Sequence, residues 1–126
     1  MAKALSLEEK INKTLEYCEY SKQLATNTGH KVCYLVEIEN TYDETETEEQ
    51  HAVRIYRRQI GYTADNRTFL HCAICQAVLD AQQYSQNHNC LSSVKVYIET
   101  HDKDGIIVDE EPVDDYEIHF EGGYQI

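Results

Sequence analysis

Apolar residues recur at helical spacing in two segments of the chain. The first opens with Ser6 and Glu9 at the spacing of a capping box, an arrangement that satisfies two backbone N–H groups at the start of a helix. Its apolar stripe consists of Leu7, Ile11, Leu15 and Cys18. The pattern predicts a helix from Leu7 to about Thr26, and Gly29 suits the turn that ends it.

The second helical segment lies within residues 63–89. Its core stripe consists of Leu70, Ile74, Ala77, Val78 and Ala81, which is the spacing of one helix face. Cys72, Cys75 and Leu79 extend the apolar arc over more than half of the circumference. We therefore expect this helix to be central in the fold or covered by another subunit.

Two segments between the helices alternate in side-chain character, as strands do. In residues 30–39 apolar side chains occupy both faces, which predicts a strand buried on most of both sides. In residues 51–62, Val53 and Ile55 share a face with Arg57, and we expect that face to be core. The acidic stretch between the two strands becomes the tip of a long hairpin.

Three further strands are expected after the second helix. Residues 94–98 and 106–108 flank an Asp-Lys-Asp-Gly turn, and residues 116–121 form a last, one-sided strand. The short connections favour antiparallel pairing, because parallel pairs need long crossovers. The sequence therefore predicts a single α+β domain over residues 1–126. Two helices lie on one face of a mostly antiparallel four- to five-stranded sheet, in the order α-β-β-α-β-β-β.

The net charge of −12 alters the expected partners. Such a charge repels nucleic acids and anionic membranes and attracts basic proteins, so we expect no direct binding to nucleic acid or membrane. No stretch approaches the roughly 20 apolar residues of a membrane span, and the charged N-terminal segment does not resemble a signal peptide. The five cysteines are an odd number, which favours reduced thiols in a cytoplasmic protein.

The carboxylates are concentrated in two segments. Residues 37–50 hold seven acidic residues and no Lys or Arg, and residues 99–126 hold ten acidic residues and one Lys. Solvated loops explain many such runs, but the number of acids here favours a role in binding. The predicted partner-binding residues, with two tyrosines as anchors, are Tyr42, Asp43, Glu44, Glu46, Glu48, Glu49, Asp109, Glu110, Glu111, Asp114, Asp115 and Tyr116.

A cluster of arginines follows the first acidic segment. Arg54, Arg57 and Arg58 lie on the second expected strand with Tyr56, and Arg67 precedes the second helix. A partly buried arginine needs a carboxylate or a bound anion, because an unpaired interior charge is costly. One interpretation pairs these arginines with nearby acids of the hairpin. The alternative is a pocket for a nucleotide or phosphate, since guanidinium groups suit phosphate geometry.

Part of a zinc-site pattern occurs in Cys72, Cys75, His88 and Cys90. A single residue separates His88 from Cys90, which is shorter than the spacing usual in zinc sites. The expected helix would also hold the two ends of the pattern about 20 Å apart. Packed thiols are therefore the favoured interpretation, and we expect no metal.

The segment from Thr100 to Glu111 matches part of a calcium-binding loop. Asp102, Asp104 and Gly105 occupy its third, fifth and sixth positions. Thr100 replaces the first carboxylate, however, and expected strands rather than helices flank the segment. A turn with a glycine bulge accounts for these residues without calcium.

Catalytic signatures are missing from the sequence. The six histidines are scattered, and no glycine-rich phosphate loop or serine elbow occurs, so we expect neither an enzyme nor a cofactor. The leading hypothesis is an inhibitor that occludes a basic site on another macromolecule, as nucleic-acid mimics, immunity proteins and phage anti-defence proteins do. The alternative is a sponge-like protein that binds a nucleotide. The apolar surplus of the second helix and of the C-terminal residues also predicts a homodimer.

Overall fold

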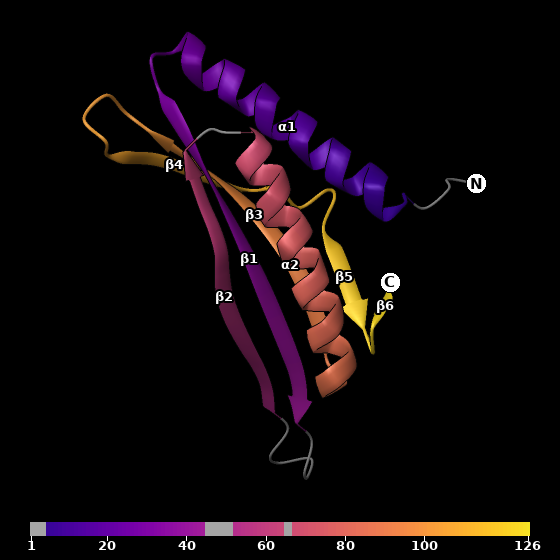
Figure 1. The fold of residues 1–126 in the computed structure, drawn as a ribbon. Coiled ribbons are helices and arrows are strands. Elements are labelled where there is room, and N and C mark those ends of the chain that lie inside the picture. Colours follow the sequence, from indigo (N-terminus) through magenta and orange to yellow (C-terminus); the bar gives the residue numbers. More distant parts are fainter. Residues whose placement is uncertain (1–4, 45–51, 65–66) are drawn as a thin grey trace.

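A computed structural model describes the backbone of residues 5–44, 52–64 and 67–126, and the side chains of residues 5–41 and 67–126. Two helices, α1 (Leu7–Asn27) and α2 (Arg67–His88), pack on one face of an antiparallel sheet (Figure 1). This arrangement confirms the predicted α+β fold and its order of elements. A two-residue strand near the C-terminus adds a sixth strand to the four or five expected.

The ends of α1 are formed as its sequence predicts. The Ser6 hydroxyl accepts a hydrogen bond from the Glu9 backbone N–H at 3.2 Å, and the Glu9 carboxylate accepts one from the Ser6 N–H at 3.4 Å. After the helix, Gly29 has a φ of +78°, a conformation that costs little only without a Cβ atom. The His30 N–H then donates to the Ala25 carbonyl at 2.8 Å, which closes the last turn.

The sheet has the order β2-β1-β3-β5-β6, and β4 pairs with β3. Its strands are β1 (Lys31–Glu44), β2 (Ala52–Ala64), β3 (Leu91–His101), β4 (Ile107–Pro112), β5 (Ile118–Glu121) and β6 (Tyr124–Gln125). β3 is the central strand: it pairs with β1 along one side, and with β5 and then β4 along the other. All of these pairs are antiparallel.

The core lies between the two helices and one face of β1 and β3. The buried apolar residues of β1 and β3 are Val32, Tyr34, Val36, Ile38, Val94, Val96 and Ile98, and the predicted stripe of α2 is buried as well. The buried tyrosine and serine hydroxyls have partners here, which offsets their desolvation. The Tyr34 hydroxyl donates to the Cys18 carbonyl at 3.1 Å, and Ser92 Oγ donates to Asn40 Oδ1 at 2.6 Å.

Burial on the second face of β1 is weaker than the sequence predicts. Cys33 and Leu35, on the face opposite the helices, are only half-buried. We call this helix-free side the open face of the sheet. Among the described residues, no helix packs on this face (Figure 1).

The register of β2 corrects the expected core face of that strand. The pairing of β1 with β2 shifts by one residue between Val36 and Glu37. Beyond the shift, Ile55 pairs with Thr41. Thr41 alternates with the buried residues of β1, so it lies on the open face. The backbone positions of Val53 and Ile55 therefore belong to the open face. Alternation identifies residues that share a face but not the face that helices cover.

The outer side of α2 is more exposed than packed thiols would require. Cys72 is exposed and Cys75 is half-buried, so the interpretation of a packed thiol is wrong for Cys72. Leu79 is 62% exposed on the same helix. Among the described residues, no helix is both long enough and apolar enough to cross a membrane.

Candidate functional site

The predicted partner-binding residues lie in two parts of the chain. Those at the end of β1, where only the backbone is described, are Tyr42, Asp43 and Glu44. Those outside the described residues are Glu46, Glu48 and Glu49. The remaining six, from Asp109 to Tyr116, lie on β4 and on the turn after it. The structure therefore brings the last group together, and a binding role stays a prediction for all three groups.

The acidic surface, as we call it, consists of Asp109, Glu110, Glu111, Asp114 and Asp115. All except Glu111 are exposed. Within the described part of the chain, none of these five carboxylates forms an ion pair with a basic side chain. Buried Val113 fixes the segment to the sheet, because its N–H donates to the Val96 carbonyl at 2.8 Å.

Two tyrosines connect the acidic surface to α1. The Tyr17 hydroxyl donates to the Glu111 carboxylate, and this hydrogen bond, with burial and the negative charge of Glu111, raises the pKa of Tyr17 to about 12. Tyr116, predicted as an anchor, is half-buried, and the Lys13 ammonium lies 6.0 Å from its ring centroid. Both contacts hold the acidic segment against the helix.

A groove runs beside the acidic surface, between the C-terminal half of α1 and strands β3 and β4. It encloses about 370 Å³. Leu24 and Ala25 of α1, Ile98 of β3 and Val108 of β4 give it an apolar lining, and Asp109 and Glu111 also line it. We call this hollow the β4 groove. Apolar and acidic groups thus meet on one accessible surface.

The arginine cluster is only partly described. Arg67 forms an ion pair with Glu19 at 2.6 Å, so its acidic partner lies on α1 and not in the hairpin, as the first interpretation expected. The adjoining cavity encloses about 80 Å³, less than the several hundred Å³ typical of a small-molecule site.

The register of β2 places its arginines at backbone positions on both faces of the sheet. Arg58 pairs with buried Ile38, whereas Arg57 pairs with Glu39 on the open face. Arg54 and Tyr56 alternate with Arg57 and so fall at positions on the face of Arg58. The side chains of these β2 residues are not described, and their nucleotide pocket stays a prediction.

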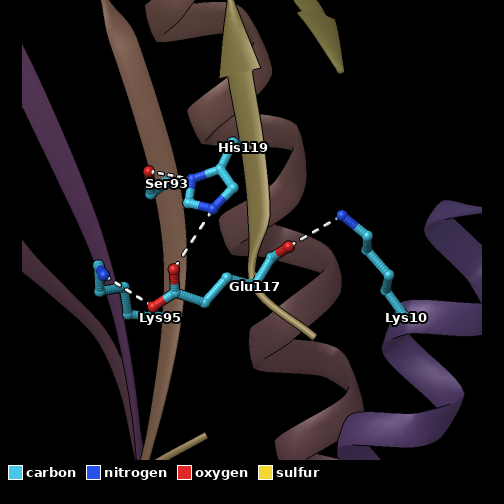
Figure 2. A network of polar contacts seen from close by, with 5 residues as sticks. All are labelled: Lys10, Ser93, Lys95, Glu117 and His119. Carbon is cyan, nitrogen blue, oxygen red and sulfur yellow. Dashed lines mark hydrogen bonds and ion pairs between the residues drawn. The ribbon is translucent and has the colours of Figure 1, made fainter. Parts of the chain in front are cut away.

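A polar network on the open face was not expected from the sequence (Figure 2). His119 of β5 lies between Ser93 and Glu117: its Nδ1 is 2.7 Å from Ser93 Oγ, and its Nε2 is 3.3 Å from Glu117 Oε2. The other Glu117 oxygen pairs with Lys95 at 2.7 Å. Lys10 of α1 donates to the Glu117 carbonyl at 3.0 Å, so the network joins β3, β5 and α1.

Burial and neighbouring charges together set the protonation of this network. Burial lowers the pKa of His119 below its ordinary value, and the positive charges of Lys95 and Lys10 add to this effect against the opposing charges of Glu117 and Glu39. Burial also lowers the pKa of Lys95, but its hydrogen bond to Glu117 and the negative charge of Glu117 outweigh burial and raise that pKa. Both shifts favour a neutral His119 beside a charged Lys95.

Ser93, His119 and Glu117 are connected in the order of a hydrolase triad. Two features distinguish this set of residues from a catalytic triad. Ser93 is only 5% exposed, and β3 pairs with β1 and β5 on either side of it. The local backbone N–H groups are thus engaged in the sheet and do not form an oxyanion site. We interpret the network as structural.

Neither metal-binding pattern of the sequence forms a metal site in the part of the chain that the structure describes. The Asp102 carboxylate accepts hydrogen bonds from the backbone N–H groups of Asp104 and Ile106, each at 2.9 Å, and Gly105 has a φ of +80°. This is the predicted glycine turn. In the described residues, no group of three or more His, Cys, Asp or Glu side chains is placed to hold a metal ion.

Comparison of the chain with protein-family models, curated proteins and solved structures found no match. Function is therefore inferred from the geometry of the acidic surface and the β4 groove.

The lowered pKa of His119 predicts a pH-dependent stability. The unfolded chain takes up this proton near pH 6.5, before the folded chain does, so the His119 contribution is present above that pH and is lost as the pH falls below it. We expect the free energy of unfolding, measured in urea from about pH 8 to pH 5, to fall less steeply for His119→Gln than for the wild type. His71→Gln, which removes an exposed histidine of α2, is the control. Identical slopes for wild type and His119→Gln would contradict the assignment.

Proposed function

We propose that this protein is a small, non-enzymatic binding protein that occludes a basic site on another macromolecule. The observation that carries the proposal is the acidic surface: five carboxylates gather on β4 and the turn after it, and none forms an ion pair within the described residues. Carboxylates so close together repel one another, and a cationic partner relieves that repulsion.

The mechanism has an electrostatic step and a contact step. The net charge of −12 steers the protein toward a cationic groove and raises the association rate. Apolar side chains of the β4 groove, with Leu24 49% and Val108 51% exposed, then lengthen the lifetime of the complex. The classes of protein that act in this way are nucleic-acid mimics, toxin-neutralising immunity proteins and anti-defence inhibitors. Their partners are basic or nucleic-acid-binding proteins.

We also propose that the protein is a cytoplasmic homodimer. Its five cysteines are free thiols, which fits a reducing compartment. Large apolar side chains remain exposed on the outer side of α2, where Phe69 and Leu79 are 63% and 62% exposed, and at the C-terminus, where Tyr124 is 78% exposed. A second copy that covers the α2 surface would remove much of this apolar area from water.

Neutralising the acidic surface is expected to slow partner binding. A basic partner recovered from the source cell by pull-down should associate with the triple variant Asp109→Asn, Glu110→Gln, Asp114→Asn about tenfold more slowly than with the wild type at low salt. The matched control, Glu8→Gln, Glu16→Gln, Glu121→Gln, removes the same charge from other exposed positions and should lose less. A rate that ignores salt, or equal losses for the two variants, would refute the proposal.

Self-association is expected to depend on the outer side of α2. In reducing buffer at micromolar concentration, light scattering should give about twice the chain mass of 14.6 kDa. Leu79→Glu should shift the protein toward the monomer, because it places a charge in the apolar contact. Leu24→Glu, the same change at an exposed position of α1, should leave the mass unchanged. A wild-type mass near 14.6 kDa would exclude the homodimer.

A further inference from the structure

β4 presents an unpaired strand edge. It pairs with β3 and with no other strand of the described residues. Because the Val113 N–H donates to the Val96 carbonyl, alternation along the strand directs the backbone of Glu111 and Asp109 toward β3 and that of Glu110 outward. Pro112 also falls at an outward position, where its missing N–H removes no bond to β3. An outward row of backbone groups is a template for another strand.

The β4 groove adjoins this edge on the side of α1. Its apolar members come from both walls: Leu24 and Ala25 from the helix, and Ile98 and Val108 from the sheet. A strand added beside β4 would direct alternate side chains toward the space between β4 and α1, since successive side chains of a strand point to opposite faces. The groove therefore offers a place for those side chains.

The charges around the groove specify the kind of side chain. Asp109 and Glu111 line it together with the apolar groups, and the Tyr17 hydroxyl fixes the Glu111 carboxylate. Lys and Arg combine an aliphatic stem with a cationic head. The aliphatic stems can pack against Leu24 and Val108, and the cationic heads can pair with the carboxylates of Asp109 and Glu111. The surface is therefore complementary to basic side chains.

The same charges disfavour a second copy of this chain at the β4 edge. In an antiparallel pair of two β4 strands, the acids Asp109, Glu110 and Glu111 of one copy would lie near those of the other. Like charges on opposed strands are destabilising, and charged edges are a common means of preventing self-pairing. The charges of this edge therefore disfavour pairing with a second copy of the chain and favour pairing with a basic segment.

We propose that the outer edge of β4 binds an extended, basic segment of the partner protein as an added strand, with Lys or Arg side chains in the β4 groove. The inference rests on the proposed function, since it requires a basic partner, and it specifies how that partner is held. Main-chain hydrogen bonds to β4 supply affinity, and the groove selects the side chains.

The first test uses a short peptide of alternating lysine and valine and its fully N-methylated analogue, with the 126-residue chain labelled for NMR. The two peptides have the same charges and side chains, but the analogue lacks backbone N–H donors. We expect the unmethylated peptide to perturb the β4 amides and to bind at least about tenfold more tightly, which corresponds to the loss of one or two net hydrogen bonds. Equal binding of both peptides, or no binding of either, would overturn the added strand.

The second test changes the edge of β4 itself. Glu110→Pro removes the outward N–H and the charge, whereas Glu110→Gln removes the charge alone. Neither change removes a bond to β3, because this backbone N–H points outward. We expect Glu110→Pro to weaken peptide binding about tenfold beyond Glu110→Gln, with folding verified by circular dichroism.

The two variants also separate the binding mode from the proposed function. Equal losses for Glu110→Pro and Glu110→Gln would mean that charge alone attracts the peptide; the added strand would then be wrong, and the acidic surface would still bind a basic partner. Failure of the proposed function itself would appear separately, as a partner association rate that does not depend on salt.

Discussion

The burial of alternate side chains from β1 and β3 beneath α1 and α2 is the interaction on which the rest of the structure depends. Val36 and Ile38 of β1 are fully buried, and Ile98 of β3 and Ile74 of α2 are 1% exposed. Each such side chain contributes about 1.5–3 kcal/mol relative to exposure. Both helices pack on this one face. The other face and the edges of the sheet are therefore stabilised by other contacts.

The open face and the exposed β4 edge result from the packing of both helices on one face of the sheet. On the open face, the Lys95–Glu117 pair and the Ser93–His119 contact connect β3 and β5 through polar groups that tolerate partial exposure. At the edge, β4 is attached to β3 on one side, and Tyr17 of α1 bonds to Glu111. The carboxylates of β4 are therefore held on a defined backbone rather than on a loose loop, which suits a binding surface.

The sequence predicted the features that depend on local periodicity. The stripe from Leu70 to Ala81 and the capping pair of Ser6 and Glu9 follow from spacing alone, and both are confirmed. The acidic residues from Asp109 to Asp115 were also identified, because a run of carboxylates is visible in one dimension. Their position on an edge strand beside a groove was not, since it depends on which strand β4 joins.

Long-range pairing determines the features that the sequence did not predict. Ser93 and His119 are cross-strand partners although they lie 26 positions apart, and no local pattern relates them. The face of Val53 and Ile55 depended on the pairing of β2 with β1, including a shift at Val36. Alternation predicts neither feature. It fixes the relative orientation of side chains within one strand, but it identifies neither the neighbouring strand nor the face that the helices cover.

Amide hydrogen exchange of the free 126-residue chain, resolved by NMR, tests most directly whether the sheet ends in an open β4 edge. An open edge predicts strong protection for the amides of Leu35 and Tyr97, which face each other between β1 and β3, and intermediate protection for Glu111, whose N–H faces β3. The Glu110 amide should exchange almost as fast as in an unfolded peptide, because it points to solvent. Protection of Glu110 equal to that of Glu111 in the free chain would show that the edge is already covered, and would contradict a β4 edge that is open to a partner.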